Sequence, residues 1–141
     1  MSLINNTDGK RYLSWKDVED LIDILHSNIL ESKLQIKYIY GIPRGGLIPA
    51  VLLSHKMGVP LTNYAYTKNT LIVDDICDSG KTLEDHLAPN PTAVLHYKPH
   101  TSTITPDIYA NKFNSDDWIV YPWEQLDSET IQDYKSKNFI G

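Results

Sequence analysis

The chain has 141 residues, a length typical of a single domain with one hydrophobic core. Hydrophobic residues make up 41% and charged residues 22% of the sequence, a balance that excludes extended disorder and low-complexity scaffolds. The formal net charge of −5 gives no overall electrostatic reason to bind nucleic acid or an anionic membrane, so we expect neither partner.

Two further features favour a cytoplasmic protein. The single cysteine, Cys77, excludes an intramolecular disulfide framework and a cysteine-rich zinc site. No apolar run approaches the length of about 20 residues that spans a bilayer, and the first ten residues are polar rather than signal-like. We therefore expect one domain over residues 1–141, located in the cytoplasm.

The first predicted helix begins after Ser14. Asp17 follows three residues later, which completes an approximate capping box, and apolar residues then recur at helical spacing over residues 18–29. Residues 35–40 are rich in Ile and Tyr and run into a glycine. This pattern indicates a strand that ends in a loop.

A second helix is predicted over residues 47–57, with Gly58 placed to cap its C-terminus. Residues 59–66 have the composition of a short strand. Residues 70–73 form an apolar, β-branched run, which is typical of a strand covered on both faces. We expect an acidic loop over residues 74–79 to follow it.

The remaining elements continue the alternation. A short helix is predicted near residues 81–87, strands at 93–97, 104–109 and 118–121, and a polar helix at 128–137. Strands that alternate with helices indicate an α/β domain with a largely parallel central sheet flanked by helices. Because open sheets of this kind bind ligands at the carboxyl ends of their strands, the loops after the strands are the candidate site.

The first such loop reads Gly41-Ile42-Pro43-Arg44-Gly45-Gly46. Adjacent glycines let the backbone approach a ligand closely, and the arginine guanidinium can bind an oxyanion through two parallel hydrogen bonds. A tight strand-to-helix turn with a solvated arginine is the alternative interpretation.

The second loop lies within the segment LIVDDICDSGKT, residues 71–82. Its end imitates a P-loop, but that motif needs a glycine where this chain has Asp75. Two adjacent carboxylates suit vicinal sugar hydroxyls or a divalent cation, and the hydroxyls and amides of residues 79–82 suit a phosphate monoester. An exposed acidic turn remains the alternative.

These two loops resemble those of a known family. Residues 71–82 resemble the phosphoribosyl pyrophosphate (PRPP) signature of type I phosphoribosyltransferases, and residues 41–46 resemble their pyrophosphate loop. The likeness is closest to the bacterial xanthine-guanine members of that family. It extends in patches over residues 12–15, 44–50, 98–99, 117–119 and 122–124.

The resemblance implies a fold and an activity. We expect a type I phosphoribosyltransferase fold whose small hood is formed by the N-terminal segment and parts of residues 98–124. The implied enzyme converts a 6-oxopurine (guanine, xanthine or hypoxanthine) and PRPP to the nucleoside 5′-monophosphate and pyrophosphate, with Mg²⁺ as cofactor, in purine salvage. It also implies a homo-oligomer, either a dimer or a tetramer.

The resemblance implies roles for the PRPP-binding residues as well. Asp74 and Asp75 would hold the ribose hydroxyls, with Asp75 as the metal ligand. Arg44 and Gly45 would bind the leaving pyrophosphate, and the Pro43–Arg44 bond is the candidate for the family's cis non-proline peptide. The 5′-phosphate would be bound by Ser79, Gly80, Lys81 and Thr82.

The remaining implied roles concern the base. Asp78 would also belong to the PRPP-binding residues, and it would lie near N7 of the purine and accept its proton, as the one catalytic residue. Lys98 would donate to the 6-oxo group, Trp118 would stack on the ring, and the backbone of Ile119 would bind its edge.

The chain departs from the family's pattern between the second helix and the PRPP strand. Only residues 59–70 lie there, whereas the family usually has a longer mobile loop that closes over PRPP. A site without such a lid is wetter and stabilises developing charge less well. A PRPP-binding or nucleotide-binding regulatory module with little turnover is therefore an open alternative, as is an enzyme for a pyrimidine base.

Other chemically active side chains favour structural roles. Cys77 has no obvious base beside it, so we expect a packed side chain rather than a nucleophile. His96 and His100 lie four residues apart, but Pro99 between them disfavours a helical metal-binding pair.

Overall fold

The structure is a computed structural model of the chain, and it describes residues 4–5, 9–64, 68–85 and 90–124. The helices are α1 (Trp15–Ser32), α2 (Leu47–Met57) and α3 (Lys81–Glu84). The strands are β1 (Ile4–Asn5), β2 (Lys10–Tyr12), β3 (Tyr38–Gly41), β4 (Thr70–Cys77), β5 (Thr92–Tyr97), β6 (Ile108–Lys112) and β7 (Trp118–Val120).

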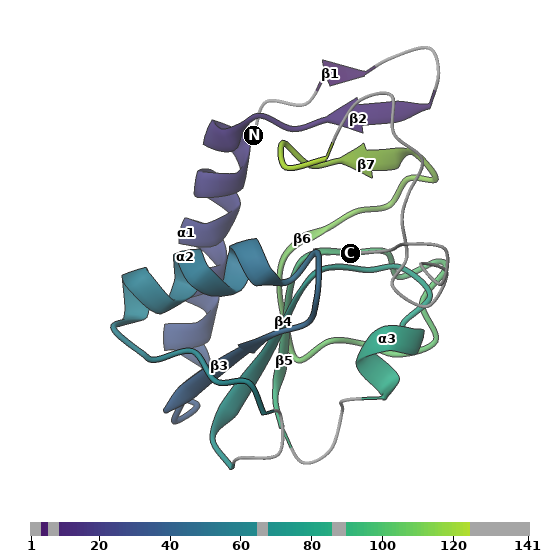
Figure 1. Cartoon of the computed structure of the whole chain (residues 1–141). Helices are drawn as coiled ribbons and strands as arrows, with labels where there is room; N and C mark the ends of the chain where they lie inside the picture. The colour runs from purple at the N-terminus through teal and green to yellow at the C-terminus, as the bar shows by residue number, and fades with distance from the viewer. Residues whose placement is uncertain (1–3, 6–8, 65–67, 86–89, 125–141) are drawn as a thin grey trace, which may run out of the picture.

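The centre of the molecule is a four-stranded sheet in the order β3-β4-β5-β6, and every neighbouring pair is parallel. Helices α1 and α2 pack against one face of this sheet, and α3 lies on the other side (Figure 1). All six residues of β5 and the first five of β4 are buried, because these central strands are covered on both faces. The predicted α/β fold with a parallel sheet is confirmed.

Helix α1 forms as its sequence predicts. The Ser14 hydroxyl accepts a hydrogen bond from the Asp17 amide at 3.0 Å, and the Asp17 carboxylate accepts from the Ser14 amide at 2.9 Å. This reciprocal capping box fixes the start of the helix. Its buried stripe packs on β5 and β6 through Val18, Leu21, Ile22, Leu25 and Ile29.

Strand β4 is longer than predicted. Asp74 and Asp75 lie inside the strand rather than in a loop after it, because the ladder with β5 continues past them to the pair Cys77–Tyr97. An apolar run predicts only the part of a strand that other elements cover on both faces. Backbone hydrogen bonds to the neighbouring strand can continue beyond that part. The acidic loop is therefore shorter than expected and begins after Cys77.

Other predicted elements differ from the structure or lie outside the described residues. A strand over residues 59–66 is wrong for the described part, where Leu61 makes only an isolated bridge with Ile39. The strand predicted at residues 104–109 begins at Ile108 and continues to Lys112. The predicted helix at 128–137 and the end of the helix at 81–87 lie outside the described residues.

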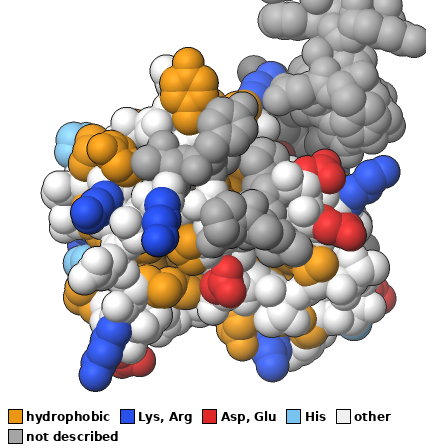
Figure 2. Space-filling view, turned by 90° about the horizontal axis from the view of Figure 1, so that it is seen from below, with side chains coloured by type: hydrophobic (Ala, Val, Ile, Leu, Met, Phe, Trp, Pro, Cys, Tyr) orange, Lys and Arg blue, Asp and Glu red, His pale blue; other side chains and the backbone are white. Residues whose placement is uncertain are grey.

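A second, smaller sheet has the order β1-β2-β7, with β1 antiparallel to β2 and β2 parallel to β7. It joins the N-terminal residues to residues 118–120 and lies beyond the carboxyl ends of the central strands (Figure 1). From below, hydrophobic, acidic, basic and uncharged side chains are intermixed (Figure 2). No helix among the described residues is long and apolar enough to cross a membrane.

Candidate functional site

The two carboxylates of β4 lie at the carboxyl end of the central sheet. Successive strand residues face opposite sides, so Asp75 shares the α2 side with Val73, and Asp74 shares the α3 side with Ile72. The Asp74 carboxylate accepts the Asp75 amide at 2.9 Å, and the Asp75 carboxylate accepts the Ile76 amide at 2.8 Å. The strand thus presents one acid to each side of the sheet edge.

Burial dominates the electrostatics of this pair. Asp74 has only 8% of its surface exposed, and desolvation, followed by the neighbouring Asp75 charge, raises the pKa of its carboxyl group well above the ordinary value. Burial also raises the pKa of Asp75. Both shifts mean that the ionised pair needs positive charge or hydroxyl donors nearby.

This donor set fits Mg²⁺. Mg²⁺ binds oxygen ligands and in phosphate sites commonly uses one or two carboxylates together with substrate oxygens. Among the described residues no cluster of three or more acidic, histidine or cysteine side chains could hold a metal by itself. The fit therefore depends on a substrate that completes the coordination of the cation.

The glycine-rich loop lies directly against Asp75. A Cβ atom added at Gly45 would collide with the Asp75 carboxylate, with Cγ only 2.7 Å away. At Gly46 it would meet the backbone of Ile42 at 2.8 Å. Both glycines are required because the loop passes close to β4 and to itself.

The loop also has the predicted backbone feature, since the Pro43–Arg44 peptide bond is cis. Arg44 is exposed at the start of the turn into α2. The loop of residues 41–46 and the carboxylates of β4 thus form one site, although they are distant in sequence.

Residues 78–80 connect the end of β4 to α3, which begins with Lys81 and Thr82. Gly80 has φ +87°, a left-handed conformation that glycine adopts readily, and a Cβ there would meet Ser102 Oγ at 2.7 Å. The Ser79 hydroxyl accepts the Lys81 amide at 3.2 Å, and Ser79, Lys81 and Thr82 are exposed. The segment is a tight turn with accessible hydroxyls.

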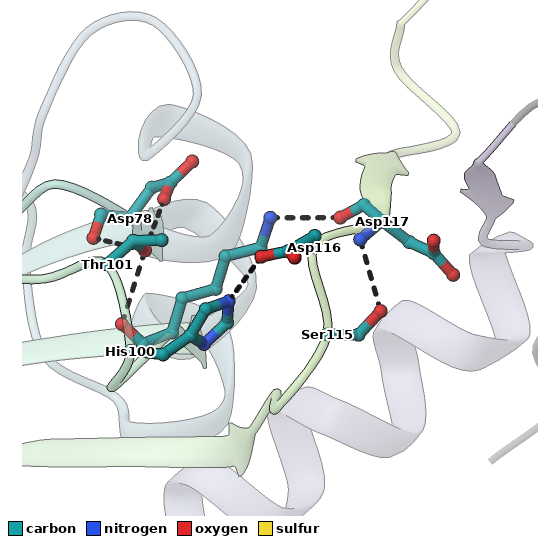
Figure 3. Close-up of polar contacts among 7 residues, drawn as sticks. Asp78, His100, Thr101, Ser115, Asp116 and Asp117 are labelled. Carbon is teal, nitrogen blue, oxygen red and sulfur yellow. Dashed lines mark hydrogen bonds and ion pairs between the residues drawn. The ribbon is translucent and has the colours of Figure 1, made fainter.

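The residues predicted to bind a base lie after β5 and in β7. Lys98 follows β5 and is 4% exposed, and its ammonium donates to the Asp117 carbonyl at 2.9 Å. Trp118 begins β7 and has 45% of its surface exposed. Figure 3 shows the bond to the Asp117 carbonyl and the Asp78 carboxylate in one view.

The backbone of Ile119 faces the open edge of the small sheet. The Trp118 amide donates to the Gly9 carbonyl at 2.8 Å, and the Val120 carbonyl accepts the Leu13 amide at 2.9 Å. Since polar backbone groups alternate sides along a strand, those of Ile119 point away from β2. They lie on the edge strand of the described sheet, where a ligand can pair with them.

Comparison with known proteins identifies this arrangement. The structure is similar to that of a purine phosphoribosyltransferase from Pyrococcus horikoshii, with 32% sequence identity and a TM-score of 0.70. The match covers 88% of this chain and 99% of that one. The chain belongs to the type I phosphoribosyltransferases.

Other members of the family are similar over most of their length. Xanthine-guanine phosphoribosyltransferase of Gluconobacter oxydans is 29% identical over 79% of this chain and 83% of its own. The enzyme of the same name from Cereibacter sphaeroides is 27% identical, over 71% of this chain and 75% of its own. No protein-family model matches the chain. The fold and the family of this phosphoribosyltransferase are as the two loops predicted.

Sequence reasoning missed a buried polar contact behind the carboxylates of this phosphoribosyltransferase. The Tyr121 hydroxyl donates to the Asp75 carbonyl at 3.2 Å, and His96 Nδ1 lies 2.8 Å from the same hydroxyl. On the same side of β4, the Val73 carbonyl accepts the Ile42 amide, the first residue after β3, at 2.9 Å. The chain then turns away, so Tyr121 supplies the donor that the Asp75 carbonyl would otherwise lack.

Two contacts between loops were also missed. Thr101 donates to Asp78, and the His100 ring lies 2.8 Å from the Asp116 carboxylate (Figure 3). They join the turn after β5 to the end of β4 and to the segment before β7. Exposed threonine and histidine residues in irregular segments carry no periodic signal, so the sequence could not have pointed to them.

The structural role expected for Cys77 is confirmed. Its side chain is 1% exposed, lies 3.2 Å from the Ser102 hydroxyl, and has its pKa raised by burial. His96 and His100 do not meet as a pair, since His96 bonds with Tyr121 and His100 with Asp116. Neither observation favours nucleophilic or metal chemistry at these positions.

Proposed function

We propose that this phosphoribosyltransferase joins a 6-oxopurine to the ribose of PRPP and releases pyrophosphate, as in purine salvage. The observation that carries the proposal is the contact of Gly45 with the Asp75 carboxylate. This contact combines a pyrophosphate-type loop and a PRPP-type strand into one site. Two of the relatives are named xanthine-guanine phosphoribosyltransferase, which supports guanine or xanthine as the base, and hypoxanthine has the same 6-oxo group.

In the proposed reaction, N9 of the base forms a bond to C1′ of the ribose while the bond from C1′ to pyrophosphate breaks. The electron pair of the broken bond leaves with pyrophosphate. Asp78 accepts the proton that the base releases from N7. Arg44 and the amides of the adjacent loop stabilise the charge that develops on the leaving group, because donors fixed in place cost little reorganisation.

Asp74 and Asp75 hold the ribose hydroxyls, and Asp75 is the ligand we assign to Mg²⁺. The cation, when bound with PRPP, neutralises charge on the pyrophosphate oxygens. Ser79, Gly80, Lys81 and Thr82 bind the 5′-phosphate through hydroxyls, amides and the lysine ammonium. The exposed hydroxyls of this turn and its left-handed glycine support that role.

The base occupies the space between Asp78 and the small sheet in this proposal. Lys98 donates to the 6-oxo group, an interaction that adenine cannot make because it presents an amine there. Trp118 stacks on the ring, and the outward-facing backbone of Ile119 bonds its edge. The exposed indole and the free edge of β7 among the described strands support this assignment.

One observation favours a different function, a PRPP-binding regulatory module with little turnover. The chain passes from the end of α2 at Met57 to the start of β4 at Thr70 with little room for a lid. Residues near its start are tied to the sheet, since Leu61 bridges Ile39. A site that stays open loses part of the charge stabilisation that catalysis needs.

The experiment that separates these functions is an assay with PRPP, Mg²⁺ and one base at a time. Guanine, xanthine, hypoxanthine, adenine, uracil and orotate are tested, and the nucleotide product is measured by chromatography. We expect product from the oxopurines and little from the others. Mg²⁺-dependent PRPP binding without product from any base would favour the regulatory module, and product from uracil or orotate alone would overturn the purine assignment.

We also propose that the chain is a cytoplasmic homo-oligomer. Exposed apolar side chains gather on α2 and the segment after it, at Leu47, Val51, Leu61 and Tyr64. Three of them line a hollow beside Pro43 at the glycine-rich loop. Light scattering at several concentrations tests this, with a dimer or tetramer expected and a monomer throughout contradicting it.

A further inference from the structure

The turn that follows β5 is folded back on itself. The Lys98 carbonyl accepts hydrogen bonds from the Thr101 amide at 3.3 Å and from the Ser102 amide at 3.1 Å. These bonds close a compact turn over residues 98–102. As a result, the side chain of Thr101 is held at a fixed place relative to the backbone of Lys98.

From this turn, Thr101 reaches the end of the neighbouring strand. Its hydroxyl donates to Asp78 Oδ1 at 2.7 Å, with the Asp78 carbonyl at 3.0 Å and the Lys98 carbonyl at 3.5 Å (Figure 3). A hydroxyl has one proton to donate, and the charged oxygen is both the nearest and the strongest of these acceptors. The principal bond is therefore to the Asp78 carboxylate.

This bond holds one side of the Asp78 carboxylate. Asp78 is half-buried in a loop, and within the described part of the chain no hydrogen bond reaches its second carboxylate oxygen. A β-branched threonine in a closed turn has few rotamers, so it is a stiff donor. With one oxygen held by Thr101, the other is left to face a ligand.

We propose that Thr101 is a positioning residue for Asp78, an inference that rests on the proposed function. It holds the carboxylate that accepts the proton of the base. Through the shared turn it also fixes that carboxylate relative to Lys98, which binds the 6-oxo group. Asp78 and Lys98, the two residues that contact the purine in this proposal, are therefore held in a fixed relation to each other. This favours the reactive orientation of the base.

The test compares Thr101→Val with Thr101→Ser and with Thr103→Val as a matched control. Thr103 lies in the same loop and donates to the Ser79 carbonyl at 3.2 Å, but it makes no contact with the Asp78 carboxylate. Thr101→Val should lower kcat with guanine about tenfold, the effect of losing a hydrogen bond to a charged group, with little change in KM for PRPP. Thr101→Ser should recover most of the loss, and Thr103→Val should stay within about twofold of wild type.

A double-mutant cycle with Asp78→Asn shows whether Thr101 acts through Asp78. In the Asp78→Asn background, Thr101→Val should change kcat by less than about twofold, because the carboxylate it positions is gone. An equal loss of kcat from Thr101→Val in the wild-type and Asp78→Asn backgrounds would overturn the proposal. An equal loss of kcat in Thr101→Val and Thr103→Val would overturn it as well.

An inactive wild-type protein would contradict the proposed function and leave the Thr101 proposal open to a separate test. The same variants are then compared for GMP affinity by calorimetry. We expect Thr101→Val to weaken GMP binding by several-fold and Thr103→Val to leave it unchanged. Equal affinity of these two variants would overturn the positioning role by itself.

Discussion

Asp78 is the residue on which the proposed chemistry depends most. It follows β4 directly and has a hydroxyl donor on one carboxylate oxygen, an arrangement suited to a fixed proton acceptor. Asp78→Asn keeps the shape of the side chain but removes its basicity. We expect kcat to fall about 10²- to 10⁴-fold, as for the loss of a general base, while PRPP affinity changes little.

Single-turnover kinetics and equilibrium PRPP binding measure the two quantities separately. Comparable losses in rate and in PRPP affinity would mean that Asp78 binds PRPP rather than the proton of the base.

Lys98 is the residue expected to select the base. Its side chain is buried and its ammonium is already held by the Asp117 carbonyl, so it is an ordered donor. Lys98→Met preserves the length of the chain without the charge. We expect the preference for guanine over adenine, as a ratio of kcat/KM values, to fall by about 10- to 100-fold.

The control for this prediction is Lys112→Met, which removes an exposed lysine at the end of β6. It should leave the preference unchanged. An unchanged ratio in Lys98→Met would show that Lys98 has only a structural role.

The resemblance of residues 71–82 and 98–99 to the family predicted roles for these two positions. Thr101 was not predictable in the same way. It lies 23 residues from Asp78 in the sequence, and only the closed turn after β5 brings the two together. Contacts of this kind depend on tertiary geometry that local sequence does not specify.

At the scale of elements, the packing of the glycine-rich loop against β4 creates the PRPP site. Gly45→Ala would place a methyl group on the Asp75 carboxylate. We expect PRPP affinity to fall by at least tenfold, because either the loop or the carboxylate must move. The midpoint temperature of thermal unfolding should change by only a few degrees, since the loop is at the surface.

Gly58→Ala serves as the control, because Gly58 caps α2 on the far side from the loop and a Cβ there would meet open space. It should reduce stability through its left-handed backbone and leave PRPP affinity unchanged. Wild-type PRPP affinity in Gly45→Ala would contradict the close packing of loop and strand.

The start of α1 and both ends of α2 followed from local signals. The capping box of α1 and the glycine that ends α2 have their predicted geometry. The end of β4 did not follow, because pairing with β5 carries the strand through Asp74 and Asp75. The two-residue and three-residue strands β1 and β2 are too short for a period-two pattern to reveal.

At the scale of the whole molecule, the buried side chain of His96 links stability to pH. Desolvation and the nearby Lys98 charge lower the pKa of His96 from 6.5 to about 4. Between these values the unfolded chain binds a proton that the native protein does not, so stability falls as pH falls. The loss over this window is about 3 kcal/mol.

The raised pKa of Asp74 acts in the opposite direction, since the native protein keeps a proton that the unfolded chain releases as pH rises. The variant His96→Phe isolates the histidine contribution. Urea unfolding from pH 7 to pH 4 should show wild type losing stability relative to this variant as pH falls. A constant difference over that range would contradict the assignment of a neutral, buried His96.

The parallel sheet was predictable from alternating elements, but the small second sheet was not. Residues 10–12 and 118–120 come from distant parts of the chain and pair in parallel. The second sheet lies beyond the carboxyl ends of the central strands, and its strand β7 carries Trp118 and Ile119. The candidate site is thus a property of the whole fold rather than of any one segment.

The most direct measurement is a crystal structure of the protein with GMP and Mg²⁺. The phosphate is expected at residues 79–82, the ribose hydroxyls at Asp74 and Asp75, and the guanine ring against Trp118 with its 6-oxo group bonded to Lys98. GMP bound away from β4 and the small sheet, or with its base outside the space between Asp78 and Trp118, would contradict the assignment of this site.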